Sequence, residues 1–187
     1  MSVPRVRISP SPPASYVSGL VILIALSAML SGAALPQSVS PQLAGLPFLL
    51  GDWRAGSGNV AETEGTSRGR STFTLEAGGN VTLRKDHTDL FTASGQPAGS
   101  FDQIMMIYPE GNTIHADYSD GAHVIHYVRA YVVAGRSVTF VSASRADAPT
   151  FRLSYELSNP TTLAVKFELA PPGSTTFHPI ATGTLTR

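Results

Sequence analysis

Residues 151–169 read FRLSYELSNPTTLAVKFEL, and this stretch indicates the fold more clearly than any other part of the chain. On both sides of Ser158-Asn159-Pro160, apolar and polar residues alternate one by one. An alternation with a period of two is typical of a β-strand that has one face on a core and the other in water. Asn and Pro favour a tight turn. The stretch therefore predicts two antiparallel strands joined by a hairpin.

The same pattern continues in both directions, so that almost everything after residue 51 is predicted to be strand. The links are short and contain Gly, Asn or Pro, as hairpin connections do. No segment after residue 51 has a helical period, which argues against parallel strands joined by helices. The ten predicted strands are Asp52–Gly58, Arg70–Ala77, Asn80–Phe91, Phe101–Pro109, Thr113–Ser119, Ala122–Val133, Ser137–Ser144, Thr150–Leu157, Thr162–Leu169 and Thr175–Thr186.

A meander of this length must curl, and closing it into a barrel pairs its two edge strands with each other. We therefore predict an all-β fold, a roughly ten-stranded antiparallel up-and-down barrel over residues 51–187. Residues 36–50 are predicted to be a linker that ends in a short helical cover over Leu43–Leu50. A flat sandwich is the alternative, although its Greek-key connections need longer loops than these links.

Residues 1–35 have the composition of an export signal. Arg5 and Arg7 precede the apolar run Val17–Leu30, and the small residues 31–34 follow that run. A basic start, an apolar centre and a small-residue exit are typical of a cleaved signal peptide. The uncharged span 17–35 is also long enough for a retained membrane anchor. We expect the globular part to be exported, either periplasmic or secreted, or held at a membrane by that span.

The composition excludes several classes of function. The chain has 13 Lys and Arg residues against 13 Asp and Glu, so we expect no nucleic-acid partner, which needs a clustered basic excess. It has no Cys, which excludes disulfides, thiolate metal sites and Cys nucleophiles. The chain also lacks the G-x-S-x-G motif of a serine nucleophile. We expect a protein without catalytic activity.

The segment Leu46–Arg54, LPFLLGDWR, resembles the start of lipocalin-like (calycin) barrels, especially small bacterial lipocalin-like domains of unassigned function. Further matching segments are Met105–Tyr108, Tyr118–Gly121 and Thr184–Arg187. The resemblance implies that Gly51 permits a close turn into the first strand and that Trp53 plugs the narrow end of the barrel. It also implies that an Arg of the last strand stacks on this Trp. Arg187 is the candidate, with Arg152 as the alternative.

The chain is more distantly similar to the nitrobindins, which have ten strands, begin with a similar Leu-Leu-Gly-x-Trp segment and bind heme through a His in the last strand. His178 lies in the last predicted strand of this chain. However, Ile180 falls where the heme ligand is expected, and His178 lies two residues earlier. The resemblance therefore leaves heme binding by His178 as an alternative to a barrel without a cofactor.

Four residues are the candidates for contacting a ligand inside the barrel. His126 shares a strand face with Val124 and Val128, which predicts an inward-pointing imidazole. Tyr108 and Arg129 are candidate polar groups that orient the ligand, and Met105 is a candidate for an adaptable apolar wall. For Arg129 the inner and outer faces are equally favoured. A metal site is not predicted, because His123 and His126 point to opposite faces.

Two further strand patterns give expectations about the outside of the barrel. Arg84 and Arg152 are predicted to lie on the outer, solvated face, opposite Leu83 and Leu153. The run Ile104–Tyr108 is apolar on both faces, which predicts a second cover outside the barrel. The segment Leu43–Leu50 or a partner subunit is the expected cover. The oligomeric state stays open.

Three functions are compatible with these residues. The first is an exported binding or carrier protein that holds a small, mostly apolar molecule inside the barrel without catalysis. The second is a heme-binding protein or heme-dependent enzyme of nitrobindin type. The third is a structural or interaction module whose barrel is filled by its own side chains, which predicts no inner cavity large enough for a ligand.

Overall fold

The computed structural model of the chain describes residues 38–60 and 63–187. The export signal predicted for residues 1–35 lies outside these ranges. Within them, no helix has both the length and the apolar character that crossing a membrane would require.

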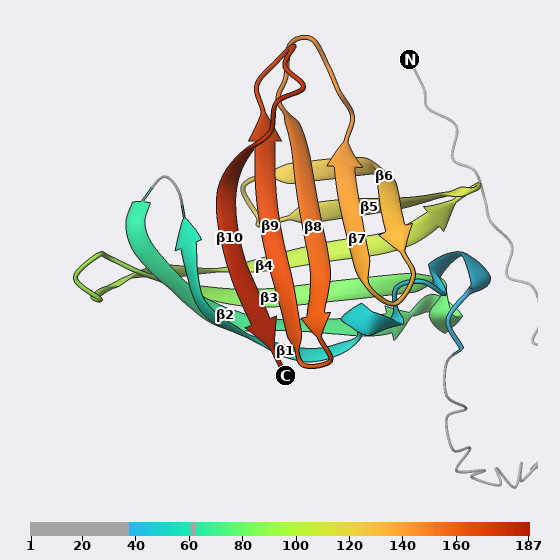
Figure 1. Cartoon of the computed structure of the whole chain (residues 1–187), viewed down its shortest axis with the longest axis horizontal. Helices are drawn as coiled ribbons and strands as arrows, with labels where there is room; N and C mark the ends of the chain where they lie inside the picture. Colours follow the sequence, from blue (N-terminus) through green and yellow to red (C-terminus); the bar gives the residue numbers. More distant parts are fainter. Residues whose placement is uncertain (1–37, 61–62) are drawn as a thin grey trace, which may run out of the picture. The chain divides into compact units, whose positions relative to one another are not determined.

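Ten antiparallel strands form one closed barrel (Figure 1). Each strand pairs with its neighbours in the chain, and β1 pairs with β10 to close the sheet. This confirms the predicted all-β, up-and-down architecture and rules out the flat sandwich. The strands are β1 (Gly51–Val60), β2 (Thr63–Glu76), β3 (Val81–Phe91), β4 (Pro97–Glu110), β5 (Thr113–Ser119), β6 (Val124–Val133), β7 (Ser137–Ser142), β8 (Thr150–Asn159), β9 (Thr162–Ala170) and β10 (His178–Thr186).

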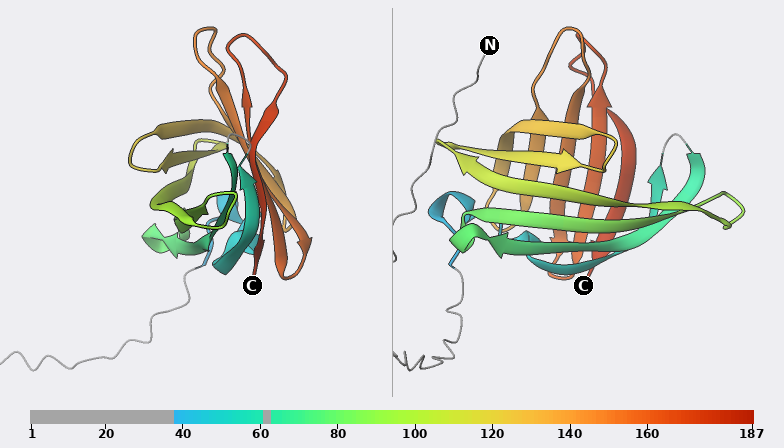
Figure 2. Two further views of the ribbon diagram at one scale, coloured as in Figure 1. Left: turned by 90° about the vertical axis from the view of Figure 1, so that its left-hand side faces the viewer. Right: turned by 180° about the vertical axis from the view of Figure 1, so that it is seen from behind.

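The main differences from the predicted bounds are at β2 and β4, which begin earlier than expected. β2 begins at Thr63 instead of Arg70, because its Ser-, Thr- and Gly-rich start is held by a continuous ladder to β3 that reaches Thr66 opposite Phe91. Figure 2 shows the β3–β4 hairpin reaching beyond the other strands. Backbone hydrogen bonds to a neighbour can thus form a strand where side chains carry little apolar signal.

One end of the barrel is closed by three 3₁₀ turns and the core residues around them. The turns are η1 (Pro41–Leu43), η2 (Pro47–Leu49) and η3 (Ala77–Gly79). The backbone of the segment that holds η1 and η2 is tied to two hairpins, by Ser40 N–H donating to Gly79 O (2.9 Å) and Gly135 N–H donating to Gly45 O (3.0 Å). Leu43, Leu46 and Leu49 are completely or almost completely buried there. The helical cover predicted over residues 43–50 is therefore present as short 3₁₀ turns.

Trp53 lies at the centre of this closed end. It is 1% exposed, and its indole N–H donates to Leu49 O at 2.7 Å. The Arg187 guanidinium lies over the indole, 4.4 Å from the ring centroid, and also donates to Leu50 O at 3.0 Å. Gly51 precedes Trp53 with φ +109°, a conformation that side chains with a Cβ rarely adopt. Of the two candidates, Arg187 and Arg152, it is Arg187 that stacks on Trp53.

The expected outer cover over β4 is not found among the described residues. Met105 and Ile107 point into the barrel and are fully buried, while Ile104 and Met106 on the other face are 46% and 41% exposed. The prediction that Leu43–Leu50 covers this face is wrong, because that segment closes the end of the barrel instead.

Candidate functional site

A cavity of about 230 Å³ lies inside the barrel. It exceeds the roughly 150 Å³ cavity that admits benzene in an engineered protein core. Gly56 and Arg70 are among its lining residues and are exposed, so the cavity reaches the molecular surface. The larger apolar side chains of its wall are Leu90, Phe101, Leu153, Val165, Phe167 and Leu185.

A buried arginine and a carboxylate form the polar part of the cavity lining. Arg84 is 6% exposed, and its Nε donates to Asp86 Oδ2 at 2.7 Å. Its Nη2 donates to Gln103 Oε1 at 3.1 Å, and its Nη1 donates to the Tyr155 hydroxyl. Asp86 also accepts a hydrogen bond from Ser71 Oγ at 2.5 Å. Because a buried charge needs both a counter-charge and hydrogen bonds, these contacts explain why the pair is tolerated inside the barrel.

Three tyrosines surround this ion pair. Tyr118 and Tyr155 have ring centroids 5.9 Å from the Arg84 guanidinium, and Tyr127 lines the same cavity. Burial, together with Asp120, raises the pKa of Tyr118 to about 12, although Arg84 and Gln103 act against this. Burial likewise raises the pKa of Tyr127 and Tyr155. The three phenols are therefore neutral at pH 7.

Arg84 is protonated and positively charged at neutral pH. Burial lowers its pKa, but Tyr155 and Asp86 outweigh that effect, so the net shift is upward. The cavity lining therefore holds one buried cation and one carboxylate side by side, with neutral hydroxyl groups around them. This arrangement provides hydrogen-bonding groups for a polar end of a bound molecule, while the apolar wall accepts the rest.

The prediction that Arg84 lies on the outer face is wrong. The period of two in β3 is present, but Thr82, Arg84 and Asp86 face inward while Leu83 faces outward. Arg84 and Asp86 stand two residues apart on one face, so each neutralises the other, and this lets a charged face occupy the interior. That opposite-charge spacing was the signal available in the sequence.

The prediction that Arg152 lies on the outer face is confirmed. Its neighbour Leu153 lines the cavity, while Arg152 Nε donates to Glu168 Oε2 at 2.6 Å and its guanidinium covers Phe177 at 4.0 Å from the ring centroid. Lys166 Nζ lies 3.1 Å from the other carboxylate oxygen of Glu168. The Glu168 side chain is only 4% exposed, so this ion pair is shielded from water although it lies outside the barrel.

Replacing Glu168 by Gln is expected to reduce the loss of stability in acid. The hydrogen bond from Arg152 lowers the pKa of Glu168 below its ordinary value of 4.5, despite burial. A carboxylate with a lowered pKa stabilises the fold above its unfolded-state pKa, and that contribution is lost as pH falls through the folded-state pKa. Urea unfolding measured at several pH values below 5 would therefore give a flatter pH dependence for Glu168→Gln than for the wild type.

The control for this experiment is Glu156→Gln. Glu156 pairs with Arg136 on the surface at 3.3 Å, and both side chains are more than half exposed. Exposed ion pairs contribute little to stability. If the free energy of unfolding of both variants falls with pH as steeply as that of the wild type, the shielded Glu168 ion pair is not the cause of the loss of stability in acid.

Tyr108 and His126, two of the predicted ligand contacts, lie on the outer face of the barrel. Asp117 joins them, because its Oδ2 accepts from the Tyr108 hydroxyl at 2.9 Å and its Oδ1 lies 2.7 Å from His126 Nδ1. The His126 side chain is 72% exposed. The predicted inward imidazole is wrong, because Ile125 and Tyr127 are the residues of β6 that face the core.

Arg129 also lies outside the barrel, where its Nη1 donates to the Tyr131 hydroxyl at 3.2 Å. A shift of register in β6 between Tyr127 and Arg129 makes Val128 and Arg129 both exposed, and inward positions resume at Ala130. Met105 is the one predicted contact that points inward. It is fully buried, with its Sδ 3.7 Å from Arg84 Nη1, but it is not among the residues that line the cavity.

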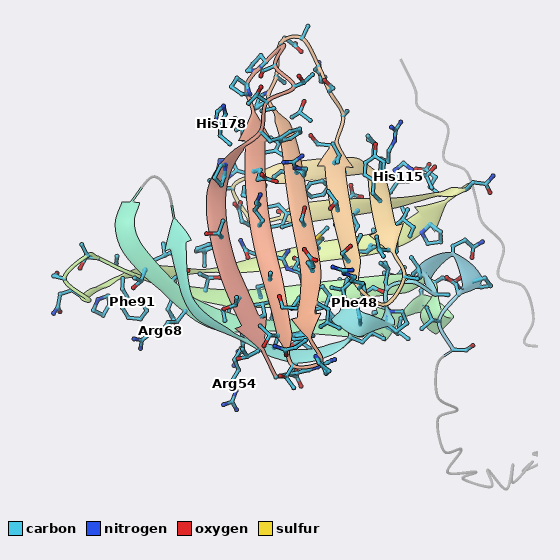
Figure 3. All side chains as sticks on the ribbon, viewed as in Figure 1. Phe48, Arg54, Arg68, Phe91, His115 and His178 are labelled. Carbon is cyan, nitrogen blue, oxygen red and sulfur yellow. The ribbon has the colours of Figure 1, made fainter. Side chains whose placement is uncertain are left out.

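The described residues do not fit a heme held by His178. The structure places His178 at the first position of β10, opposite Leu169 of β9, where it is exposed (Figure 3). It does not line the cavity, whose β10 contribution begins at Ala181. No group of three or more potential metal-ligating side chains occurs within residues 38–60 and 63–187.

Comparisons with known proteins give no family assignment. No family model matches the chain, and no curated protein matches it. A solved structure of a redesigned β-barrel, mFAP0, bound to DFHBI, is 13% identical with a TM-score of 0.40, and the match covers 75% of this chain and 99% of that one. A similarity of this size supports no inference about this chain. The observed barrel is consistent with a lipocalin-like architecture, and nothing in these comparisons links the chain to the nitrobindins.

Proposed function

We propose that the chain is an exported binding or carrier protein that holds a small, mostly apolar molecule inside its barrel and does not catalyse a reaction. The observation that supports this most strongly is the cavity of about 230 Å³, which has an apolar wall and one cluster of polar groups. Small-molecule sites commonly combine these two features. Export is proposed from the sequence of residues 1–35 alone.

The wall provides the binding free energy in this proposal. Each 100 Å² of apolar surface removed from water contributes about 2.5 kcal/mol. Trp53 and the leucines of the 3₁₀ turns close one end of the barrel, so the molecule enters at the other end, where the exposed Gly56 and Arg70 border the cavity. A barrel filled by its own side chains is less well supported, because it would leave no space of this size.

Native mass spectrometry of the exported full-length chain tests the proposal. We expect a mature mass that lacks about the first 35 residues, together with an adduct of a few hundred daltons at most, in keeping with the cavity volume. Val165→Phe, which narrows the cavity, is expected to weaken or remove the adduct. Ala164→Phe is the matched control, because it adds the same ring on the other face of β9.

The same comparison identifies failure. An adduct that survives Val165→Phe as well as it survives Ala164→Phe would place the molecule outside the barrel. The binding function would be overturned if the protein carried no adduct and, in titrations, bound neither the small bicyclic ketone 1-indanone nor indane, its hydrocarbon analogue. If the measured mass shows that residues 1–35 remain on the exported protein, the segment is a retained membrane anchor and not a cleaved signal peptide.

A further inference from the structure

Tyr127 is a buried residue whose hydroxyl group has no hydrogen-bond partner among the residues that the structure describes. The residue is 2% exposed, and its hydroxyl makes no hydrogen bond within the described residues 38–60 and 63–187. Among these residues, Ser40 Oγ is the one fully enclosed side-chain polar atom that lacks a partner. The Tyr127 hydroxyl is therefore not sealed in the core, and since Tyr127 lines the cavity, this group opens onto it.

Tyr155 offers a second proton to the same cavity. Its hydroxyl oxygen accepts a hydrogen bond from Arg84, but no acceptor for its own proton is found in the part of the chain that the structure describes. Because the pKa of both tyrosines is raised by burial, both hydroxyls stay protonated at pH 7 and act as donors. Buried donors require an acceptor, and a ligand that displaces water without offering one leaves them unsatisfied.

The charges around the cavity disfavour an anionic ligand. The N–H groups of Arg84 are already directed at Asp86, Gln103, Tyr155 and the sulfur of Met105. Asp86 is itself a carboxylate that lines the cavity, so a second carboxylate would share a single buried cation with it. Of the other basic residues that line the cavity, Arg70 is exposed and screened by water. His87 also borders the cavity, but its ring nitrogens are already paired with the carboxylates of Asp102 and Asp89.

On the basis of the proposed function, we infer that the bound molecule is a neutral carbonyl compound whose oxygen accepts a hydrogen bond from the Tyr127 hydroxyl, with the Tyr155 hydroxyl as second donor. The hydrocarbon part of the molecule lies against the apolar wall that includes Phe101, Leu153 and Phe167. A neutral acceptor satisfies the two free donors without disturbing the Arg84–Asp86 pair. In this inference the Tyr127 hydroxyl determines specificity.

The experiment compares 1-indanone with indane, which has nearly the same shape but lacks the carbonyl oxygen. By calorimetric titration we expect the wild type to bind 1-indanone about threefold to tenfold more tightly than indane, the advantage of one hydrogen bond. Tyr127→Phe should remove most of that advantage without weakening indane binding or changing the unfolding transition. Tyr131→Phe is the matched control on the outer face of the same strand, where Tyr131 is 56% exposed.

Infrared spectroscopy gives a readout that affinity alone does not. The carbonyl stretching band of bound 1-indanone should lie at lower wavenumber on the wild type than in hexane, and the shift should shrink on Tyr127→Phe but not on Tyr131→Phe. Equal binding of indane and 1-indanone, or an unchanged band on Tyr127→Phe, overturns the inference and leaves the binding function in place. Tighter binding of benzoate than of 1-indanone also overturns it, in favour of an anionic ligand. If none of the three compounds binds and the native protein carries no adduct, the proposed function itself fails, whereas an adduct without a carbonyl group overturns this inference alone.

Discussion

Replacing Arg84 by Met is expected to destabilise the barrel by about 3–5 kcal/mol, the typical cost of removing one partner of a buried ion pair. The variant leaves the Asp86 carboxylate in the interior without its counter-charge. It also removes the hydrogen bonds that Arg84 donates to Gln103 and Tyr155. Urea or guanidinium unfolding followed by far-UV circular dichroism measures the effect.

Two controls separate the charge effect from the loss of a large side chain. The double variant Arg84→Met/Asp86→Leu removes both charges, and we expect it to recover much of the lost stability, because apolar replacements of buried pairs are often neutral. Arg136→Met breaks an exposed pair with Glu156 and should cost less than about 1 kcal/mol. A cost for Arg84→Met no larger than that for Arg136→Met would contradict the buried-pair interpretation.

Replacing Trp53 by Ala is expected to cost about 3–5 kcal/mol, as for other large core residues. Trp53 is 1% exposed, and the closed end of the barrel packs around it. The substitution leaves a cavity there, removes the donor to Leu49 O, and leaves the Arg187 guanidinium without its aromatic surface. Thermal and denaturant unfolding by circular dichroism measures the loss without relying on tryptophan fluorescence.

Variants at the same site rank the contributions. Trp53→Phe keeps an aromatic ring but loses the indole donor, so we expect an intermediate cost. Arg187→Met keeps apolar contact with Trp53 and loses the cation–π interaction, worth about 0.5–2 kcal/mol. Should Trp53→Ala prove no more costly than Arg187→Met, the indole would not be the central element of the closed end.

The sequence led to the correct partner for Trp53, but it did not lead to the correct strand face for several residues of the candidate site. Trp53 and Arg187 could be paired from the sequence, because the resemblance implied an Arg of the last strand as the partner and Arg187 follows that strand directly. Tyr108 and His126 are predicted to lie in the cavity and lie outside it, and Arg129, for which both faces are equally favoured, also lies outside. Arg84 was placed outside and lies within. Each of these errors concerns which face of a strand points inward.

The period of two in the sequence by itself determined that the chain forms antiparallel hairpins, and the short links determined that the strands follow one another around a barrel. Alternation distinguishes two faces of a strand but does not say which is inside when, as at Arg84 and Asp86, two opposite charges satisfy each other. The bulge before Arg129 and the long ladder of β2 depend on pairing with neighbouring strands. Only the tertiary structure decided the cavity and which tyrosines line it, because the space inside a barrel depends on the register of all its strands together.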